Sequence, residues 1–199
     1  MELVLVRHAL PVRADAVDGG RADPGLSDLG REQAARLPGA LAGDRVDLLC
    51  TSPLCRARET AAPLAEALGV EPLVVEGIAE FDSGDPSYVP VEELRAAGDP
   101  RWHALVRGDL YSSGVDPVAF RTTVVDALAT VAAEHPGGRA VLVTHAGAIN
   151  AAAGAVLAQE RPIWFAPAYC SITRLAFSRD GRRGVVSLNE TAHVRDLLR

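Results

Sequence analysis

Histidine, arginine and glutamate side chains stand just past the ends of several apolar segments of this sequence. Arg7-His8 closes the apolar segment 2–7, and His145 follows the apolar segment 139–144. Ligands bind beyond the carboxyl ends of the strands in open α/β sheets, so we expect side chains at such positions to gather at one site. The full set of candidates is Arg7, His8, Arg56, Glu80 and His145.

This set of side chains is suited to phosphoryl transfer. A neutral imidazole can attack phosphorus and form a phosphohistidine, which divides hydrolysis into two easier steps. Arginines and a second histidine can stabilise the charge on the phosphoryl oxygens, as can the free amides of a helix that begins near Gly147. A carboxylic acid can protonate the leaving oxygen and then, as a carboxylate, activate water. The sequence supplies every part of this reaction, and we expect neither a metal nor a cofactor.

Other interpretations of the same residues exist. A single histidine at a strand end is more often structural than catalytic, and Arg56 could be an ordinary helix residue like Arg58. His8, His145 and Glu80 could also form a metal site of two histidines and one carboxylate. Two arginines beside a dication would repel it unless a phosphate lay between them, which makes the metal site the weaker alternative.

The elements that must position these side chains alternate between strand and helix. Ser27 and Ser52-Pro53 are typical of helix starts, and Asp180-Gly181 is typical of a hairpin turn. We expect strands at 2–7, 46–50, 73–75, 139–144, 171–177 and 184–189, and helices at 28–42, 53–68, 117–134 and 147–157. This order predicts an α/β fold, a three-layer α/β/α sandwich with a mostly parallel central sheet, in a single domain over residues 1–199.

Residues 84–114 interrupt this alternation. The segment is rich in proline, glycine and charge, with weak helical patterns at 91–97 and 101–106. We expect a small insertion that covers the active site. Five of its side chains could contact a leaving group, although the surface is the expected place for each of them: Arg95, Arg101, Trp102, His103 and Arg107.

The composition excludes several classes of protein. The chain has 199 residues and a net charge of −6, which argues against a nucleic-acid partner because duplex binding needs an electropositive face. No apolar stretch reaches the roughly 20 residues that span a bilayer, and no secretory segment precedes Arg7, so we expect a cytoplasmic protein with no membrane partner. All 20 cationic side chains are arginine, which excludes lysine nucleophiles and phosphate-loop lysines. We expect Cys50, Cys55 and Cys170 to be reduced thiols.

Short motifs along the chain resemble those of the histidine phosphatase superfamily, which includes cofactor-dependent phosphoglycerate mutases. Arg7-His8-Ala9 resembles the family's Arg-His-Gly signature, and segment 143–147 resembles its second-histidine motif. Three further segments are similar to its first-helix, second-arginine and acid motifs, and a fourth to its closing strand: 26–34, 52–61, 80–84 and 189–193. These motifs follow the family's order from residue 3 to residue 193, and the resemblance is to the phosphatase branch.

The resemblance implies a role for each candidate residue. His8 corresponds to the phosphorylated nucleophile, and Glu80 to the general acid that becomes the base. Asp82 is the nearest rival of Glu80, and His193 corresponds to a structural position. The residues that bind the phosphoryl group are then Arg7, His8, Arg56, His145 and Ala146.

Two positions depart from the family pattern. Ala9 stands where the family has glycine after the nucleophile, a change that is tolerated unless the backbone φ angle there is positive. Ala14 stands where many relatives have an asparagine that contacts the phosphate. Arg13 could substitute for that asparagine or face the solvent.

The leading interpretation is a phosphatase that hydrolyses a small phosphorylated metabolite through a phosphohistidine on His8, with Glu80 as acid and base. One alternative is phosphoryl transfer of the cofactor-dependent phosphoglycerate mutase type, although an insertion of only about 30 residues favours hydrolysis. A catalytically idle module that binds a phosphorylated ligand is another. A homodimer is compatible with the composition, which does not fix the oligomeric state.

Overall fold

A six-stranded sheet forms the centre of the computed structural model, which describes residues 1–16, 20–110 and 114–198. Its strands are β1 (Glu2–Arg7), β3 (Leu48–Thr51), β4 (Leu73–Val74), β6 (Arg139–Thr144), β7 (Ile172–Phe177) and β8 (Arg183–Glu190). They lie in the order β4-β3-β6-β1-β7-β8. The first four of these run parallel, and β7 and β8 add an antiparallel hairpin at one edge.

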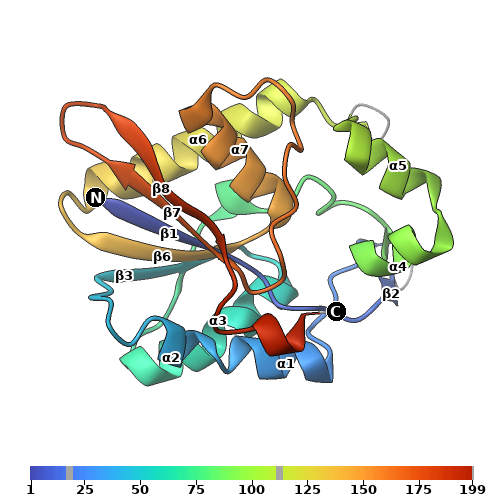
Figure 1. The fold of residues 1–199 in the computed structure, drawn as a ribbon, viewed down its shortest axis with the longest axis horizontal. Helices are drawn as coiled ribbons and strands as arrows, with labels where there is room; N and C mark the ends of the chain where they lie inside the picture. Colours follow the sequence, from blue (N-terminus) through green and yellow to red (C-terminus); the bar gives the residue numbers. More distant parts are fainter. Residues whose placement is uncertain (17–19, 111–113, 199) are drawn as a thin grey trace.

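Helices cover both faces of this sheet (Figure 1). One face carries α1 (Asp28–Ala34), α2 (Leu37–Ala40) and α3 (Cys55–Leu68), and the other carries α6 (Pro117–Glu134) and α7 (Ala146–Leu157). Side chains alternate along a strand, so Val4 and Val6 of β1 pack with the first group and Leu3 and Leu5 with the second. The predicted fold class, a three-layer sandwich around a mostly parallel sheet, is confirmed.

Two helix predictions are wrong at their boundaries. The predicted helix 28–42 is divided into α1 and α2, because Pro38 lies in the first turn of α2 and has no amide hydrogen to continue the ladder of α1. The predicted helix start at Ser52-Pro53 is also displaced, since α3 begins at Cys55 after the extended residue Leu54. The Ser52 hydroxyl has another partner, which belongs to the site described below.

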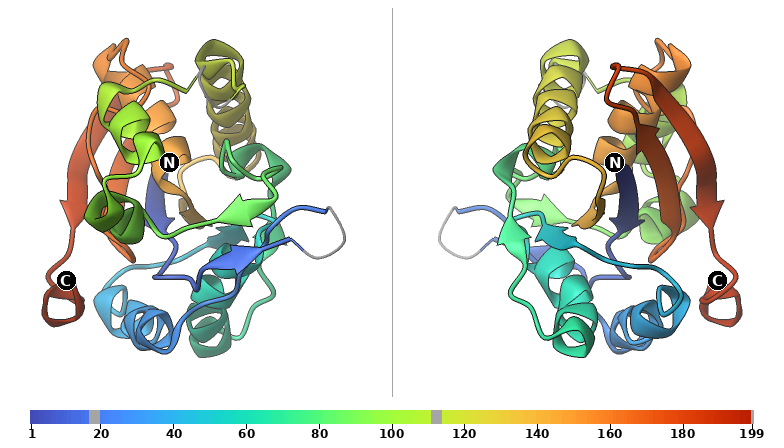
Figure 2. Two further views of the ribbon diagram at one scale, coloured as in Figure 1. Left: turned by 90° about the vertical axis from the view of Figure 1, so that its right-hand side faces the viewer. Right: turned by 90° about the vertical axis from the view of Figure 1, so that its left-hand side faces the viewer.

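A separate group of elements lies beyond the carboxyl ends of the parallel strands. It consists of α4 (Val91–Ala97), α5 (Pro100–Arg107) and a two-stranded ladder of β2 (Ala14–Asp15) with β5 (Ser87–Tyr88). The left view of Figure 2 looks onto this end of the molecule, with α4 and α5 in front of the sheet. The helical patterns of the predicted insertion 84–114 thus correspond to α4 and α5, whereas residues 111–113 of that insertion lie outside the described residues.

The cysteines and the helices bear on two expectations from the composition, that the thiols are reduced and that no segment spans a membrane. All three cysteines are unpaired, and burial raises the pKa of Cys50 and of Cys170 to about 12, so neither is a reactive thiolate. Within the described ranges, no helix has the length and the apolar character that crossing a membrane requires.

Candidate active site

A pocket of about 300 Å³ opens where the parallel strands end. Five of the six predicted site residues line it: Arg7, His8, Arg56, Glu80 and Ala146. His145, the sixth, lies behind them, with its ring fully buried and its centroid 5.0 Å from that of the His8 ring. Residues from β1, α3, α7, the segment after β6 and the segment after η1 (Glu76–Ile78) are thus brought together at one place.

The His8 imidazole is held in one tautomer by the backbone. Its Nδ1 lies 2.8 Å from the Ala9 carbonyl oxygen, which can only accept, so Nδ1 carries the hydrogen and donates it. Burial, followed by the charge of Arg56, holds the His8 pKa well below its usual value. His8 is therefore a neutral imidazole whose other nitrogen, Nε2, keeps its lone pair.

The second histidine, His145, is fixed by a serine. His145 Nε2 lies 2.7 Å from Ser52 Oγ, and among the described residues its Nδ1 has no hydrogen-bond partner. Burial and the nearby Arg56 charge hold the His145 pKa well below its usual value, so this ring is also neutral. The sequence draws attention to Ser52 as a helix cap, but its main partner here is His145, which sequence reasoning missed.

Each site arginine lies against the face of a tyrosine ring. The Arg7 guanidinium is 3.7 Å from the Tyr169 ring centroid, and the Arg56 guanidinium is 4.6 Å from the Tyr88 ring centroid. Arg7 is 7% exposed and Arg56 is 1% exposed, so both cations are largely removed from water. A ring face attracts a desolvated cation, and the two tyrosines therefore help to hold the charges at the pocket. No sequence pattern pointed to either tyrosine.

The Glu80 carboxylate is buried and anchored by two backbone amides. Oε2 accepts a hydrogen bond from the Gly147 amide at 2.9 Å, and Oε1 accepts one from the Phe81 amide at 3.2 Å. Burial, and then the negative charge of Asp82, raise the Glu80 pKa to about 7. Asp82 itself lies 3.4 Å from Arg56 Nη2. The Gly147 amide, expected to be free for an anion, is thus occupied by Glu80, and Glu80 can hold a proton near neutral pH.

Gly147 is required for this arrangement. A Cβ atom added at residue 147 would overlap Glu80 Oε1 and would lie 2.7 Å from Phe81 Cδ1. Cβ atoms in folded proteins do not approach other atoms so closely. Any residue larger than glycine at position 147 would therefore displace the Glu80 carboxylate from the amides that anchor it.

The two departures from the family pattern have different structural consequences. Ala9 is not among the described residues with positive φ, and its amide donates to Thr60 Oγ1 at 2.9 Å, so alanine is unstrained there. Ala14 pairs across the small ladder with Tyr88, the residue that lies against Arg56. Arg13 is exposed and does not line the pocket.

The insertion supplies one of the five side chains considered for contact with a leaving group. Trp102 lines the pocket, whereas the other four are exposed on α4 and α5: Arg95, Arg101, His103 and Arg107. The alternative metal site is not formed, because nowhere in the described ranges do three or more His, Cys, Asp or Glu side chains form a group that could hold a metal ion.

Comparison with known proteins identifies the family of the chain. Residues 3–191 match the family model of the histidine phosphatase superfamily (branch 1). The chain belongs to the histidine phosphatase superfamily. The prediction from the motifs is thus confirmed, and the phosphatases among the relatives support a phosphoric monoester hydrolase.

Several relatives of this histidine phosphatase match most of its length. It is 28% identical to phosphoserine phosphatase 1 of Hydrogenobacter thermophilus, over 98% of this chain and 94% of the relative. It is 31% identical to phosphoglycerate mutase-like protein 4 of Arabidopsis thaliana, over 75% of this chain and 68% of the relative. Its fold is similar to that of a mycobacterial glucosyl-3-phosphoglycerate phosphatase solved with inorganic phosphate, with a TM-score of 0.76 and 25% identity over 97% of this chain and 99% of that one.

Proposed function

We propose that this histidine phosphatase hydrolyses a small phosphomonoester through a phosphohistidine on His8, with Glu80 as general acid and then general base. The observation that carries this proposal is the hydrogen bond from His8 Nδ1 to the Ala9 carbonyl. It leaves Nε2 as a neutral nucleophile in a pocket that Arg7 and Arg56 also line. Two cations and a neutral imidazole are the combination that attack on an anionic phosphoryl group needs.

In the first step His8 Nε2 forms a bond to phosphorus as the bond from phosphorus to the leaving oxygen breaks. Glu80, with its pKa raised to about 7, gives its proton to that oxygen and becomes a carboxylate. In the second step the Glu80 carboxylate takes a proton from water as the water oxygen attacks phosphorus and the bond to Nε2 breaks. Inorganic phosphate is released, and His8 and Glu80 return to their starting protonation states.

Arg7, Arg56 and His145 are assigned to stabilise the phosphoryl oxygens during both steps. Buried nitrogen atoms on all three side chains lack hydrogen-bond partners among the described residues: Arg7 Nε, Arg56 Nε and His145 Nδ1. Arg7 Nε and Arg56 Nε are N–H donors, and His145 Nδ1 is a third donor when the Ser52 hydroxyl donates to Nε2. Unsatisfied buried donors are unfavourable, and an anion with several acceptor oxygens could satisfy them. Ala146, at the first position of α7, lines the same end of the pocket.

Rapid-quench labelling with a ³²P-phosphomonoester tests the proposal. The wild-type protein should show acid-labile label on His8 that passes to inorganic phosphate, and His8→Ala should show neither label nor turnover. The exposed His103→Ala is the matched control and should behave as the wild type. Transfer of the label to a second hydroxyl would favour the mutase alternative. Tight phosphate binding without label or release would favour the idle binding module.

A further inference from the structure

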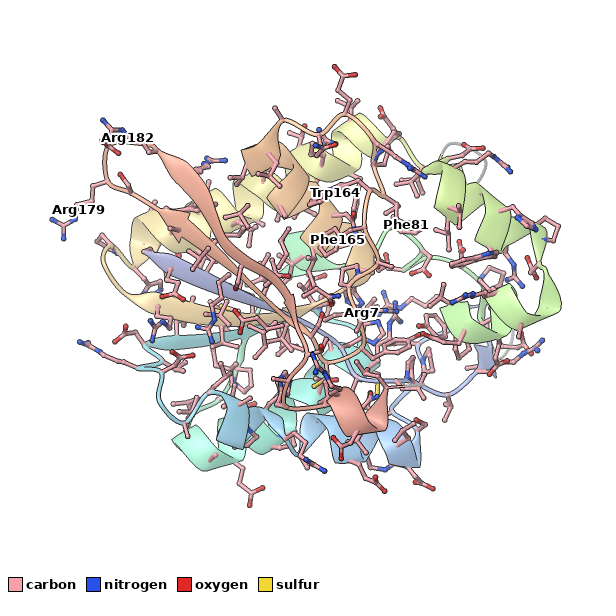
Figure 3. The ribbon with its side chains drawn as sticks, in the orientation of Figure 1. Arg7, Phe81, Trp164, Phe165, Arg179 and Arg182 are labelled. Carbon is pink, nitrogen blue, oxygen red and sulfur yellow. The ribbon has the colours of Figure 1, made fainter. Side chains whose placement is uncertain are left out.

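Most of the pocket lining beyond the charged residues is built from apolar side chains. Leu94 from α4 and Trp102 and Leu105 from α5 line it, together with Phe81, Trp164 and Phe165. These residues come from three separate stretches of the chain that meet at the end of the sheet. Figure 3 shows Phe81, Trp164 and Phe165 gathered on the same side as Arg7, whereas Arg179 and Arg182 project from the distant β7–β8 turn.

One wall of this apolar region is held in place by the buried side-chain amide of Asn150. The fully buried Asn150 of α7 accepts hydrogen bonds from the amides of Trp164 at 2.9 Å and Phe165 at 3.1 Å. Its Nδ2 donates to the Phe165 carbonyl at 3.0 Å, and Trp164 Nε1 donates to the Asn150 carbonyl at 3.2 Å. The two rings lie 4.5 Å apart between centroids. A single side chain thus fixes both aromatic residues, so this wall is formed before any ligand arrives.

Charged side chains are scarce in this region. Of the described residues that line the pocket, the charged ones at the catalytic end are Arg7, Arg56, Glu80 and Asp82. Arg161 is the other charged lining residue; it is exposed, and its stem lies beside Gly108 at the end of α5. A leaving group that carried a carboxylate or an ammonium into the apolar region would lose its hydration without gaining a buried partner, which is strongly unfavourable.

We propose that the leaving group of the substrate is apolar and uncharged, so that the preferred substrates are alkyl or aryl phosphomonoesters rather than phosphorylated amino acids or glycerates. This inference rests on the proposed function, since it concerns the far end of the same pocket. The specificity is determined by four apolar side chains: Trp102 and Leu105 of α5, and Trp164 and Phe165, which Asn150 holds. Two of the relatives described above are named for substrates with charged leaving groups, phosphoserine and glucosyl-3-phosphoglycerate, so the proposed substrate class differs from theirs.

A homologous series of substrates tests the inference. For methyl, butyl and hexyl phosphate, kcat/KM should rise about fourfold with each added methylene group. Hexyl phosphate should exceed O-phosphoserine and 3-phosphoglycerate by at least about tenfold, a factor that the burial of two methylene groups would supply. Trp102→Ala should flatten the dependence of kcat/KM on chain length, whereas the neighbouring exposed His103→Ala should keep the wild-type dependence.

Two results would overturn the inference. One is a kcat/KM that does not depend on chain length. The other is a higher kcat/KM for 3-phosphoglycerate than for hexyl phosphate that Arg161→Ala abolishes. That result would show that Arg161 binds a charged leaving group. If His8 is labelled and either result is obtained, the phosphohistidine mechanism is supported while the proposed apolar specificity is wrong. Calorimetric titration of His8→Ala, which cannot turn over, compares hexyl phosphate with phosphoserine even if the proposed hydrolysis fails, and tighter binding of phosphoserine would again overturn the inference.

Discussion

The imidazole rings of His8 and His145 lie 5.0 Å apart between centroids, tilted by 56° to one another. Burial and the charges of Arg56 and Arg7 keep the pKa of each ring well below its usual value, so two neutral imidazoles lie beside two permanent cations. A phosphoryl dianion would offset the positive charge of the two arginines, so the site is prepared for an anionic group.

Arg56 and Arg58 are two residues apart on α3 and should behave differently when replaced. Arg56 is 1% exposed and faces the pocket, whereas Arg58 is exposed on another side of the helix. We expect Arg56→Ala to lower kcat/KM for p-nitrophenyl phosphate by about 10³-fold, the usual loss for one oxyanion-stabilising group. Arg58→Ala should stay close to the wild-type value. Similar losses in the two variants would contradict the assignment of Arg56.

Replacing Glu80 by glutamine should separate the two chemical steps. Alkyl phosphates need a proton on the leaving oxygen, so Glu80→Gln should lower their kcat by at least about 10²-fold. p-Nitrophenolate leaves without a proton, but hydrolysis of the phosphohistidine still needs the base. Stopped-flow traces should therefore show one rapid equivalent of p-nitrophenol followed by a slow steady state. If Asp82→Asn gives this burst and Glu80→Gln does not, the acid is Asp82.

The raised Glu80 pKa also predicts how folding stability depends on pH. The folded protein keeps a proton on Glu80 up to about pH 7, whereas the unfolded chain loses it near the ordinary value of 4.5. Stability therefore falls as the pH rises through this window, and Glu80→Gln removes that loss. The free energy of unfolding of the variant minus that of the wild type should increase by up to about 3 kcal/mol from pH 4.5 to pH 7 and then stay level. Urea denaturation at a series of pH values measures this difference in the free energy of unfolding. If the free energy of unfolding of the two proteins has the same pH dependence, the Glu80 pKa is not raised.

Gly147→Ala should inactivate the enzyme without unfolding it. The added methyl group would overlap Glu80 Oε1, so the carboxylate must move and the general acid is misplaced, with an expected loss of about 10²-fold in kcat. Gly39→Ala is the matched control, because a Cβ at Gly39 would have no neighbour within 4 Å. In α2 that change should leave activity intact and add up to about 1 kcal/mol of stability. Full activity of Gly147→Ala would show that Glu80 can act from another position.

The sequence predicted the elements of the fold better than their junctions. Buried strands such as β1 and β6 are continuous apolar runs that follow from local pattern alone, and α6 has the predicted bounds. The division between α1 and α2 was missed because the effect of Pro38 was outweighed by the apolar periodicity around it.

The candidate site was predicted only as far as its residues follow strand ends or match a motif. The hydrogen bond between Ser52 and His145 joins residues that are 93 positions apart, and Tyr169 contacts Arg7 across most of the chain. Such partners depend on the sheet order, which one sequence does not specify. Asn150 was missed for a different reason, because its role depends on the path by which the loop after α7 brings residues 164–165 back against that helix.

The position of β1 in the sheet has a consequence for biosynthesis. Of the six strands of the sheet, β1 is synthesised before the others, yet both of its neighbours, β6 and β7, come from the last third of this sequence. During translation, more than 130 residues are added after the apolar segment 2–7 before its first partner strand, β6, is complete. An unpaired apolar strand of this kind is prone to aggregation until its partners have been synthesised. Because β1 carries Arg7 and leads into His8, recovery of phosphatase activity reports the closing of the whole sheet.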